Sequence, residues 1–151
     1  MISKLPALII WDWSKTLITD DIRINHIKPM PHIPYILSLC KKKNITQCIL
    51  SNGDIRSIIS GIRDLQWWYF KWINGYISTD FFETNKQLNS QIEYKPSAKG
   101  IHQAVEYFKC SINDVWMIGD SSSDQFAAKA ADCEWKFPDE EFFSQFIDML
   151  K

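Results

Sequence analysis

Short apolar runs alternate along this chain with stretches that carry apolar residues at helical spacing. The runs at 7–11 and 115–118 are continuous, which predicts buried strands, and residues 46–50 predict a further strand between them. Strands that alternate with helices form parallel sheets, because right-handed crossover helices pack back onto the sheet they connect. The pattern therefore predicts an α/β fold with a central parallel sheet and helices on both faces.

The predicted helices have apolar sides and recognisable ends. Residues 33–43 place Ile36, Leu37 and Cys40 on one side, with Pro34 in the first turn. Three further helices are expected: one capped by Asp54, one capped by Ser97 and one over 125–131. The tail predicts a last amphipathic helix with Phe142, Phe146 and Leu150 on its apolar side.

Two other segments have weaker patterns. Residues 72–78 predict a strand with a turn at Asn74 and Gly75, and the polar stretch 83–91 predicts a loop. The aromatic cluster before the strand favours core and sheet packing over a binding surface, although so many aromatic residues cannot all be buried on one face. Its members are Trp67, Trp68, Tyr69, Phe70 and Trp72.

Composition limits the classes of protein that the chain can belong to. A length of 151 residues with 46% hydrophobic content predicts a single domain, 1–151. The net charge of −1 gives no electrostatic basis for binding nucleic acid or an anionic membrane, and no apolar stretch reaches the ~18 residues needed to span a bilayer. The four cysteines are widely spaced and no signal peptide is apparent, which favours a reducing, cytoplasmic location.

Polar side chains follow the predicted strands at the points where the strands end. Because ligands of such sheets bind beyond the carboxyl ends of the strands, these side chains should converge on one site. The set is Asp12, Ser51, Asn52, Asp120 and Asp124, and it is joined by Lys95, which lies just before the predicted helix that leads to the strand at 115–118. Carboxylates suit Mg²⁺, while a hydroxyl, an amide and an ammonium suit phosphoryl oxygens. Asp12 would then attack phosphorus and form an aspartyl-phosphate.

Four motifs resemble those of the haloacid dehalogenase superfamily. They are "DWSKTL" from Asp12, "ILSNGD" from Ile49, "KPSAKGI" from Lys95 and "VWMIGDSSSDQFAAKAADC" from Val115, in the family's order. The resemblance implies a three-layer Rossmann-like fold. It also implies a nucleophile at Asp12 and a Mg²⁺ site made by Asp12, Asp120, Asp124 and the main-chain carbonyl of Ser14. Thr16, Ser51, Asn52 and Lys95 are expected to bind the phosphorylated substrate.

The chain departs from the family pattern at two positions of the first motif. Ser14 stands where the family's phosphatases have an aspartate that protonates the leaving group, and positioned acid–base catalysis contributes about 10² to 10⁴-fold. Slow hydrolysis of alkyl phosphates is therefore expected. Lys15 stands where the family favours glycine, and its side chain either reshapes the loop or supplies a cation near the leaving group.

The spacing of the motifs predicts an open site without a full cap domain. Only 38 residues separate Asp12 from Ser51 and 43 separate Ser51 from Lys95, and the sheet and its helices use most of them. An open site favours a phosphoprotein substrate, or a homo-oligomer or protein partner that supplies the missing wall.

Two function classes remain open. One is a weak or specialised Mg²⁺-dependent phosphohydrolase acting on good leaving groups. The other is a catalytically silent binding module that uses the open pocket and the aromatic cluster as a partner surface. Simpler roles are also open for single residues: Asp120 and Asp124 as helix caps, Ser51 and Asn52 as turn residues, and Lys95 as a surface cation.

Overall fold

The computed structural model describes residues 2–19, 28–52, 71–78, 87–90 and 95–151. The predicted helix after Asp54 and most of the aromatic cluster, residues 67–70, lie outside these ranges. The segments in which a cap domain would be inserted also lie outside these ranges. The expectation of a single domain without a cap therefore stays a prediction. Among the described residues, no helix is long and apolar enough to cross a membrane.

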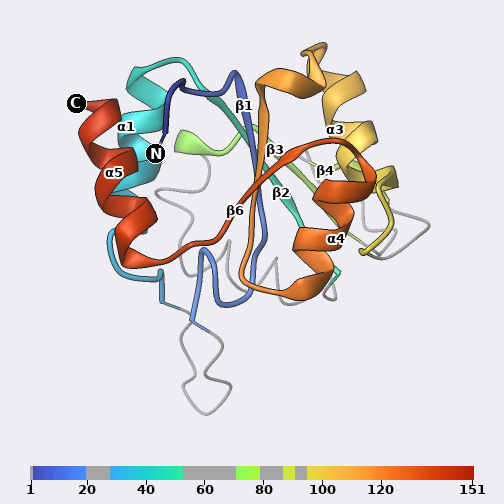
Figure 1. The fold of residues 1–151 in the computed structure, drawn as a ribbon, viewed down its shortest axis with the longest axis horizontal. Helices are drawn as coiled ribbons and strands as arrows, with labels where there is room; N and C mark the ends of the chain where they lie inside the picture. Colours follow the sequence, from blue (N-terminus) through green and yellow to red (C-terminus); the bar gives the residue numbers. More distant parts are fainter. Residues whose placement is uncertain (1, 20–27, 53–70, 79–86, 91–94) are drawn as a thin grey trace.

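A six-stranded sheet forms the centre of the molecule, and all of its paired strands are parallel (Figure 1). Its order is β4-β3-β2-β1-β5-β6, which places β1 between β2 and β5. The strands are β1 (Leu8–Trp11), β2 (Thr46–Leu50), β3 (Gly75–Ser78), β4 (Gln87–Ser90), β5 (Val115–Ile118) and β6 (Glu134–Lys136).

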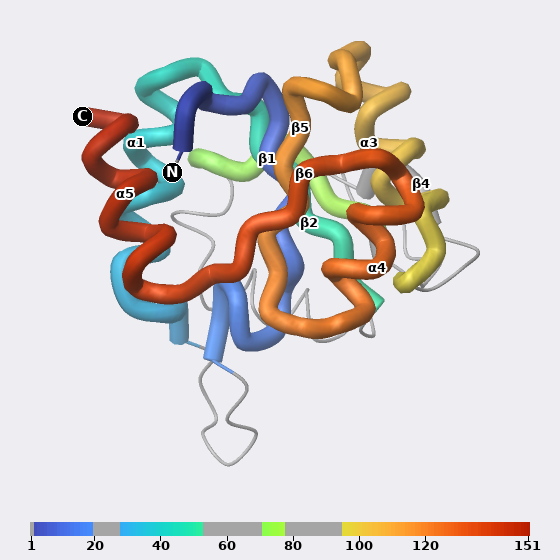
Figure 2. The backbone as a smooth tube through the Cα atoms, in the orientation of Figure 1, coloured from blue at the N-terminus to red at the C-terminus, as the bar shows by residue number. Residues whose placement is uncertain are grey.

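Four helices cover the two faces of this sheet in the described part of the chain. Helices α1 (Ile33–Lys42) and α5 (Glu140–Leu150) pack on one face, and α3 (Lys99–Phe108) and α4 (Ser122–Ala130) pack on the other. Figure 2 shows the chain leaving β6 and crossing to α5, on the opposite side of the sheet from α4. The predicted three-layer α/β architecture is confirmed.

The central strands supply both halves of the core. Successive residues of β1 point to opposite faces, so Ile9 and Trp11 pack under α1 and α5, while Leu8 and Ile10 pack under α3 and α4. Helix α5 adds Phe146, whose ring centroid lies 5.2 Å from that of Trp116 on β5. The helices therefore bury β1 and β5 completely. This packing holds in place the sheet edge that carries the site.

Two edge strands and one turn differ from the sequence-based prediction. Residues 87–90, predicted as loop, form β4, and β6 was not predicted at all. Both are short, polar strands at the ends of the sheet order, where backbone pairing with one neighbour is enough and apolar periodicity is not required. No turn forms at Asn74: its backbone N–H donates to the carbonyl of Gln47, and Gly75 begins β3.

The helix predictions that fall on described residues are correct within a few residues. Ser97 lies just outside α3, yet its Oγ accepts a hydrogen bond from the backbone N–H of Lys99 at 3.2 Å. Helix α4 begins three residues earlier than predicted, at Ser122. All four cysteines, Cys40, Cys48, Cys110 and Cys133, are free.

Candidate active site

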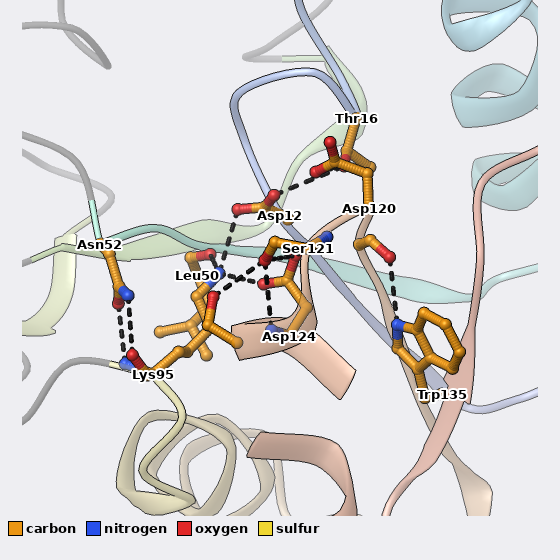
Figure 3. Close-up of polar contacts among 11 residues, drawn as sticks. Asp12, Thr16, Leu50, Asn52, Lys95, Asp120, Ser121, Asp124 and Trp135 are labelled. Atoms are coloured by element: carbon orange, nitrogen blue, oxygen red, sulfur yellow. Dashed lines mark hydrogen bonds and ion pairs between the residues drawn. The ribbon is translucent and has the colours of Figure 1, made fainter. Parts of the chain in front are cut away.

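The carboxyl ends of β1, β2 and β5 bring the predicted polar residues together (Figure 3). Asp12 directly follows β1, and its backbone N–H donates to the carbonyl of Ile118 at 2.9 Å, which continues the pairing of β1 with β5. Asp120 follows β5 and Ser51 follows β2. The three strands are neighbours in the sheet, so the predicted convergence at one edge is observed.

Lys95 is a buried cation at the centre of the site, with a side chain that is 2% exposed. Its Nζ donates to Oδ1 of Asp12 at 3.0 Å, to Oδ1 of Asp124 at 2.6 Å and to the main-chain carbonyl of Leu50 at 3.0 Å. An ammonium group has three donors, and these contacts use all of them. Lys95 therefore has the ion pairs that burial of a charge requires, and the surface-cation interpretation is excluded.

Asp124 has two roles at the start of α4. Its Oδ1 faces Lys95, while its Oδ2 accepts hydrogen bonds from the backbone N–H and the hydroxyl of Ser121. The Ser121 hydroxyl in turn accepts a bond from the backbone N–H of Asp124, which completes a capping box. A Cβ atom at Gly119 would lie 2.2 Å from Oδ2 of Asp124, so only glycine fits beside this carboxylate.

Three carboxylates form a group that could hold a metal ion. One oxygen each from Asp12, Asp120 and Asp124 lies within 4.8 Å of the other two. Carboxylate oxygens are hard ligands, the type that Mg²⁺ and Ca²⁺ prefer, so the donor set fits a hard divalent cation. The Thr16 hydroxyl lies 3.5 Å from Oδ2 of Asp12 and from Oδ1 of Asp120, which places this buried side chain between two of the carboxylates.

Burial raises the pKa of Asp12 from 3.8 to about 7. The positive charge of Lys95 lowers this pKa and the negative charge of Asp124 raises it, but the loss of solvent is the largest cause. The carboxyl group thus sits in an environment that disfavours its charge. A divalent cation at the three carboxylates would favour the ionised form.

The loop after Asp12 makes a tight turn around Ser14 and Lys15. The backbone N–H of Lys15 donates to the carbonyl of Ile18 at 2.9 Å, and Ser14 forms an isolated bridge with Ile18. Lys15 has φ of 61° and is exposed. This left-handed conformation favours glycine, which explains in physical terms why a glycine suits this position.

The Asn52 side chain hydrogen-bonds to both the backbone N–H and the backbone carbonyl of Lys95. Its Oδ1 accepts from the backbone N–H of Lys95 at 2.9 Å, and its Nδ2 donates to the backbone carbonyl of Lys95 at 3.0 Å. Ser51 is buried, and its backbone N–H donates to the carbonyl of Ile77 at 3.1 Å. The expected contacts of both residues with phosphoryl oxygens stay predictions.

Several residues contribute to the site without having been predicted. Ser121 forms the capping box, and the spacing Ser121 to Asp124 is a pattern by which a sequence can reveal one. Trp135 of β6 donates from Nε1 to the carbonyl of Gly119 at 3.0 Å, next to Asp120. Nothing in the local sequence signals that contact, because it depends on the pairing of β6 with β5.

Comparison with known proteins identifies one family. A family model described as haloacid dehalogenase-like hydrolase matches residues 9–136, which span the chain from β1 to β6. No curated protein sequence matches the chain.

Solved structures share the fold at low sequence identity. A haloacid dehalogenase superfamily hydrolase from Ehrlichia chaffeensis is 17% identical, with a TM-score of 0.72 over 99% of this chain and 100% of its own. A hydrolase from Streptococcus pneumoniae is 12% identical, with a TM-score of 0.74 over 96% and 100%. CbbY from Rhodobacter sphaeroides, in complex with phosphate, is 11% identical, with a TM-score of 0.68 over 88% and 86%.

Proposed function

The chain belongs to the haloacid dehalogenase-like hydrolases, and on that basis we propose that it is a Mg²⁺-dependent phosphohydrolase with Asp12 as its nucleophile. The observation that carries this proposal is the pair of contacts made by one buried ammonium, 3.0 Å to Asp12 and 2.6 Å to Asp124, beside a third carboxylate. The structure of a relative in complex with phosphate supports phosphoryl chemistry in this fold.

In the proposed reaction an oxygen of Asp12 attacks phosphorus, and the bond from phosphorus to the leaving oxygen breaks with its electron pair going to that oxygen. Water then attacks phosphorus, the bond between phosphorus and the Asp12 oxygen breaks with its electron pair returning to the carboxylate, and the proton of the water passes to the released phosphate. Lys95 holds the carboxylate in place and offsets the negative charge of the phosphoryl group, with Thr16 and Ser51 as further ligands. Mg²⁺, held by Asp12, Asp120, Asp124 and the Ser14 carbonyl, would supply the remaining positive charge when bound.

Ser14 limits the substrates that such a site can hydrolyse. A serine hydroxyl does not titrate near neutral pH, so it cannot protonate an alkoxide leaving group as a carboxylic acid does. Phenolic and acyl phosphates leave without that proton. We therefore expect turnover of phosphates with good leaving groups and little turnover of alkyl phosphates.

A groove next to the site favours a phosphoprotein substrate. It has a volume of about 290 Å³, and its lining includes Trp135, Phe137, Asp139 and Glu141. The strand that lines the groove, β6, hydrogen-bonds to Gly119, the residue before Asp120. The ammonium of Lys136 in the same groove is paired with a carboxylate, so Asp139 and Glu141 leave the groove acidic.

Aromatic walls with an acidic rim fit a chain that carries apolar and basic side chains around the phosphorylated residue. Phosphopeptides flanked by lysine or arginine should therefore have a lower KM than the same peptides flanked by glutamate. Glu141→Lys should remove this preference, whereas Glu106→Lys on α3, on the other face of the sheet, should retain it. A small sugar phosphate hydrolysed more efficiently than any phosphopeptide would refute the phosphoprotein assignment.

The proposed activity is tested by purified protein with Mg²⁺ against an aryl, an acyl and an alkyl phosphate. We expect hydrolysis of the first two and its loss in Asp12→Asn, because no nucleophile remains. Mg²⁺ should also raise the Tm, and Asp120→Ala should abolish that rise while Asp148→Ala on α5 retains it. No turnover of any substrate, with Mg²⁺ still bound, would favour the silent binding module instead.

A further inference from the structure

Asn52 and Lys95 are 43 positions apart in the sequence, yet the Asn52 side chain pairs with both main-chain polar groups of Lys95. The two hydrogen bonds are 2.9 and 3.0 Å long, which is ordinary geometry for strong amide contacts. Figure 3 shows the Asn52 carboxamide directed at the main chain of Lys95 and away from the Asp12 carboxylate. The carboxamide oxygen and one of the two N–H groups on Nδ2 are therefore engaged with Lys95 before any substrate arrives.

The position of the Lys95 main chain matters because its side chain has little freedom once it is buried. Its Nζ must reach two carboxylates and the carbonyl of Leu50 at the same time. A lysine side chain has four rotatable bonds, so a shift of its Cα moves the ammonium out of one or more of these contacts. One hydrogen bond lies on each side of that Cα, at the Lys95 N–H and at the Lys95 carbonyl, and together they restrict the position and orientation of the Cα.

We infer that Asn52 is a positioning residue for Lys95 and not a ligand of the phosphoryl group. The carboxamide fixes the main chain of Lys95 so that its ammonium meets Asp12, Asp124 and Leu50 together. The structural part of this inference stands on the contacts alone. Its consequence for phosphate binding rests on the proposed function.

The structural part is tested by NMR of the lysine ammonium groups in the metal-free protein. A buried ammonium whose three protons are all donated exchanges slowly with water and gives a resolved ¹⁵N signal, which Lys95→Met identifies by its loss. Asn52→Ala should broaden or shift this signal, whereas Asn113→Ala, the same change at an exposed asparagine, should not. An unaltered signal in Asn52→Ala, or no resolved signal in the unchanged protein, would overturn the inference.

A second variant covers the case in which Asn52→Ala does not fold. Asn52→Asp has the same shape and keeps the acceptor for the Lys95 N–H, but it loses the donor to the Lys95 carbonyl. The Lys95 signal should shift in this variant too. A signal identical to that of the unchanged protein would count against the inference.

The functional part is tested by the binding of inorganic phosphate with Mg²⁺, measured by calorimetry in a double-mutant cycle. Asn52→Ala should weaken phosphate binding about tenfold when Lys95 is present, but by less than about twofold in the Lys95→Met background. An equal loss in both backgrounds would show that Asn52 contacts phosphate directly and would overturn the inference. If the unchanged protein binds no phosphate, the proposed function fails, and the ammonium signal still decides the role of Asn52.

Discussion

The ammonium of Lys95 lies 2.6 Å from Oδ1 of Asp124, and their side chains are 2% and 0% exposed. Each of these charges is buried among groups from other segments of the chain. A buried ion pair is weak evidence of stability, but removal of one partner leaves an uncompensated charge in the interior. Removal of either charge should therefore lower the free energy of unfolding.

Asp124→Ala should lower the free energy of unfolding by about 3–5 kcal/mol, because it breaks the buried pair and also removes the capping box with Ser121. Asp120→Ala is the matched control. Asp120 is a half-buried carboxylate of the same group, and it accepts a long 3.5 Å hydrogen bond from Thr16. Urea unfolding of the metal-free proteins measures both losses, and similar losses for the two variants would contradict the expectation.

The raised pKa of Asp12 predicts a pH-dependent gain of stability in Asp12→Asn. Ionisation of a carboxyl group whose pKa is higher in the folded state costs folding free energy. The metal-free protein therefore loses stability as the pH rises from 3.8 through about 7. Asparagine does not ionise, so Asp12→Asn avoids that loss. The stability that the variant gains over the unchanged protein should therefore be larger at pH 8 than at pH 5.

Urea midpoints in the presence of a chelator measure this difference at both pH values. Asp148→Asn, the same change at an exposed position on α5, shows how much of the effect is general. A gain for Asp12→Asn that is the same at pH 5 and pH 8 would mean that the Asp12 carboxyl is not disfavoured by burial.

Lys15→Gly should stabilise the protein by up to about 1 kcal/mol. The residue has φ of 61°, which costs an L-residue conformational energy that glycine does not incur, although the greater freedom of glycine in the unfolded chain offsets part of the gain. Lys15→Ala retains the unfavourable conformation and should bring no such gain. Thermal melts of the two variants separate the backbone effect from loss of the side chain.

The same pair of variants addresses the alternative roles of the Lys15 side chain. If its ammonium assists the leaving group, both variants should lose turnover of an aryl phosphate to the same extent. If the side chain only shapes the loop, Lys15→Gly and Lys15→Ala should differ, because they leave different backbone preferences.

Ser14→Asp should raise turnover of alkyl phosphates more than turnover of aryl phosphates, by up to about 10² to 10⁴-fold. The new carboxylic acid supplies the proton that an alkoxide needs, provided that the exposed Lys15 leaves room for it. Rates of the two substrate types with the unchanged and substituted proteins measure the effect. Equal rates for aryl and alkyl phosphates in the unchanged protein would contradict the missing-acid explanation.

Much of the fold could be predicted from local patterns. The apolar runs that form β1 and β5 are buried on both faces, and burial of that kind leaves a continuous apolar sequence. The same patterns predicted that the polar residues after these strands share one edge, because parallel strands end together. These patterns identify Asp12, Asp120 and Asp124, and Lys95 is identified by its place in the third motif, just before α3. The family assignment is confirmed by the match over 9–136.

The sequence by itself thus determined the layers, the strands β1, β2 and β5, and the carboxylates and lysine that meet at the site. The tertiary structure decided the edge strands β4 and β6, the attachment of Asn52 to the Lys95 main chain, and the raised pKa of Asp12. The physical reason is that apolar periodicity reports only which side chains are buried. Backbone pairing at a sheet edge, hydrogen bonds across 43 residues and the loss of solvent around a carboxyl group depend on distant segments, which no local pattern records.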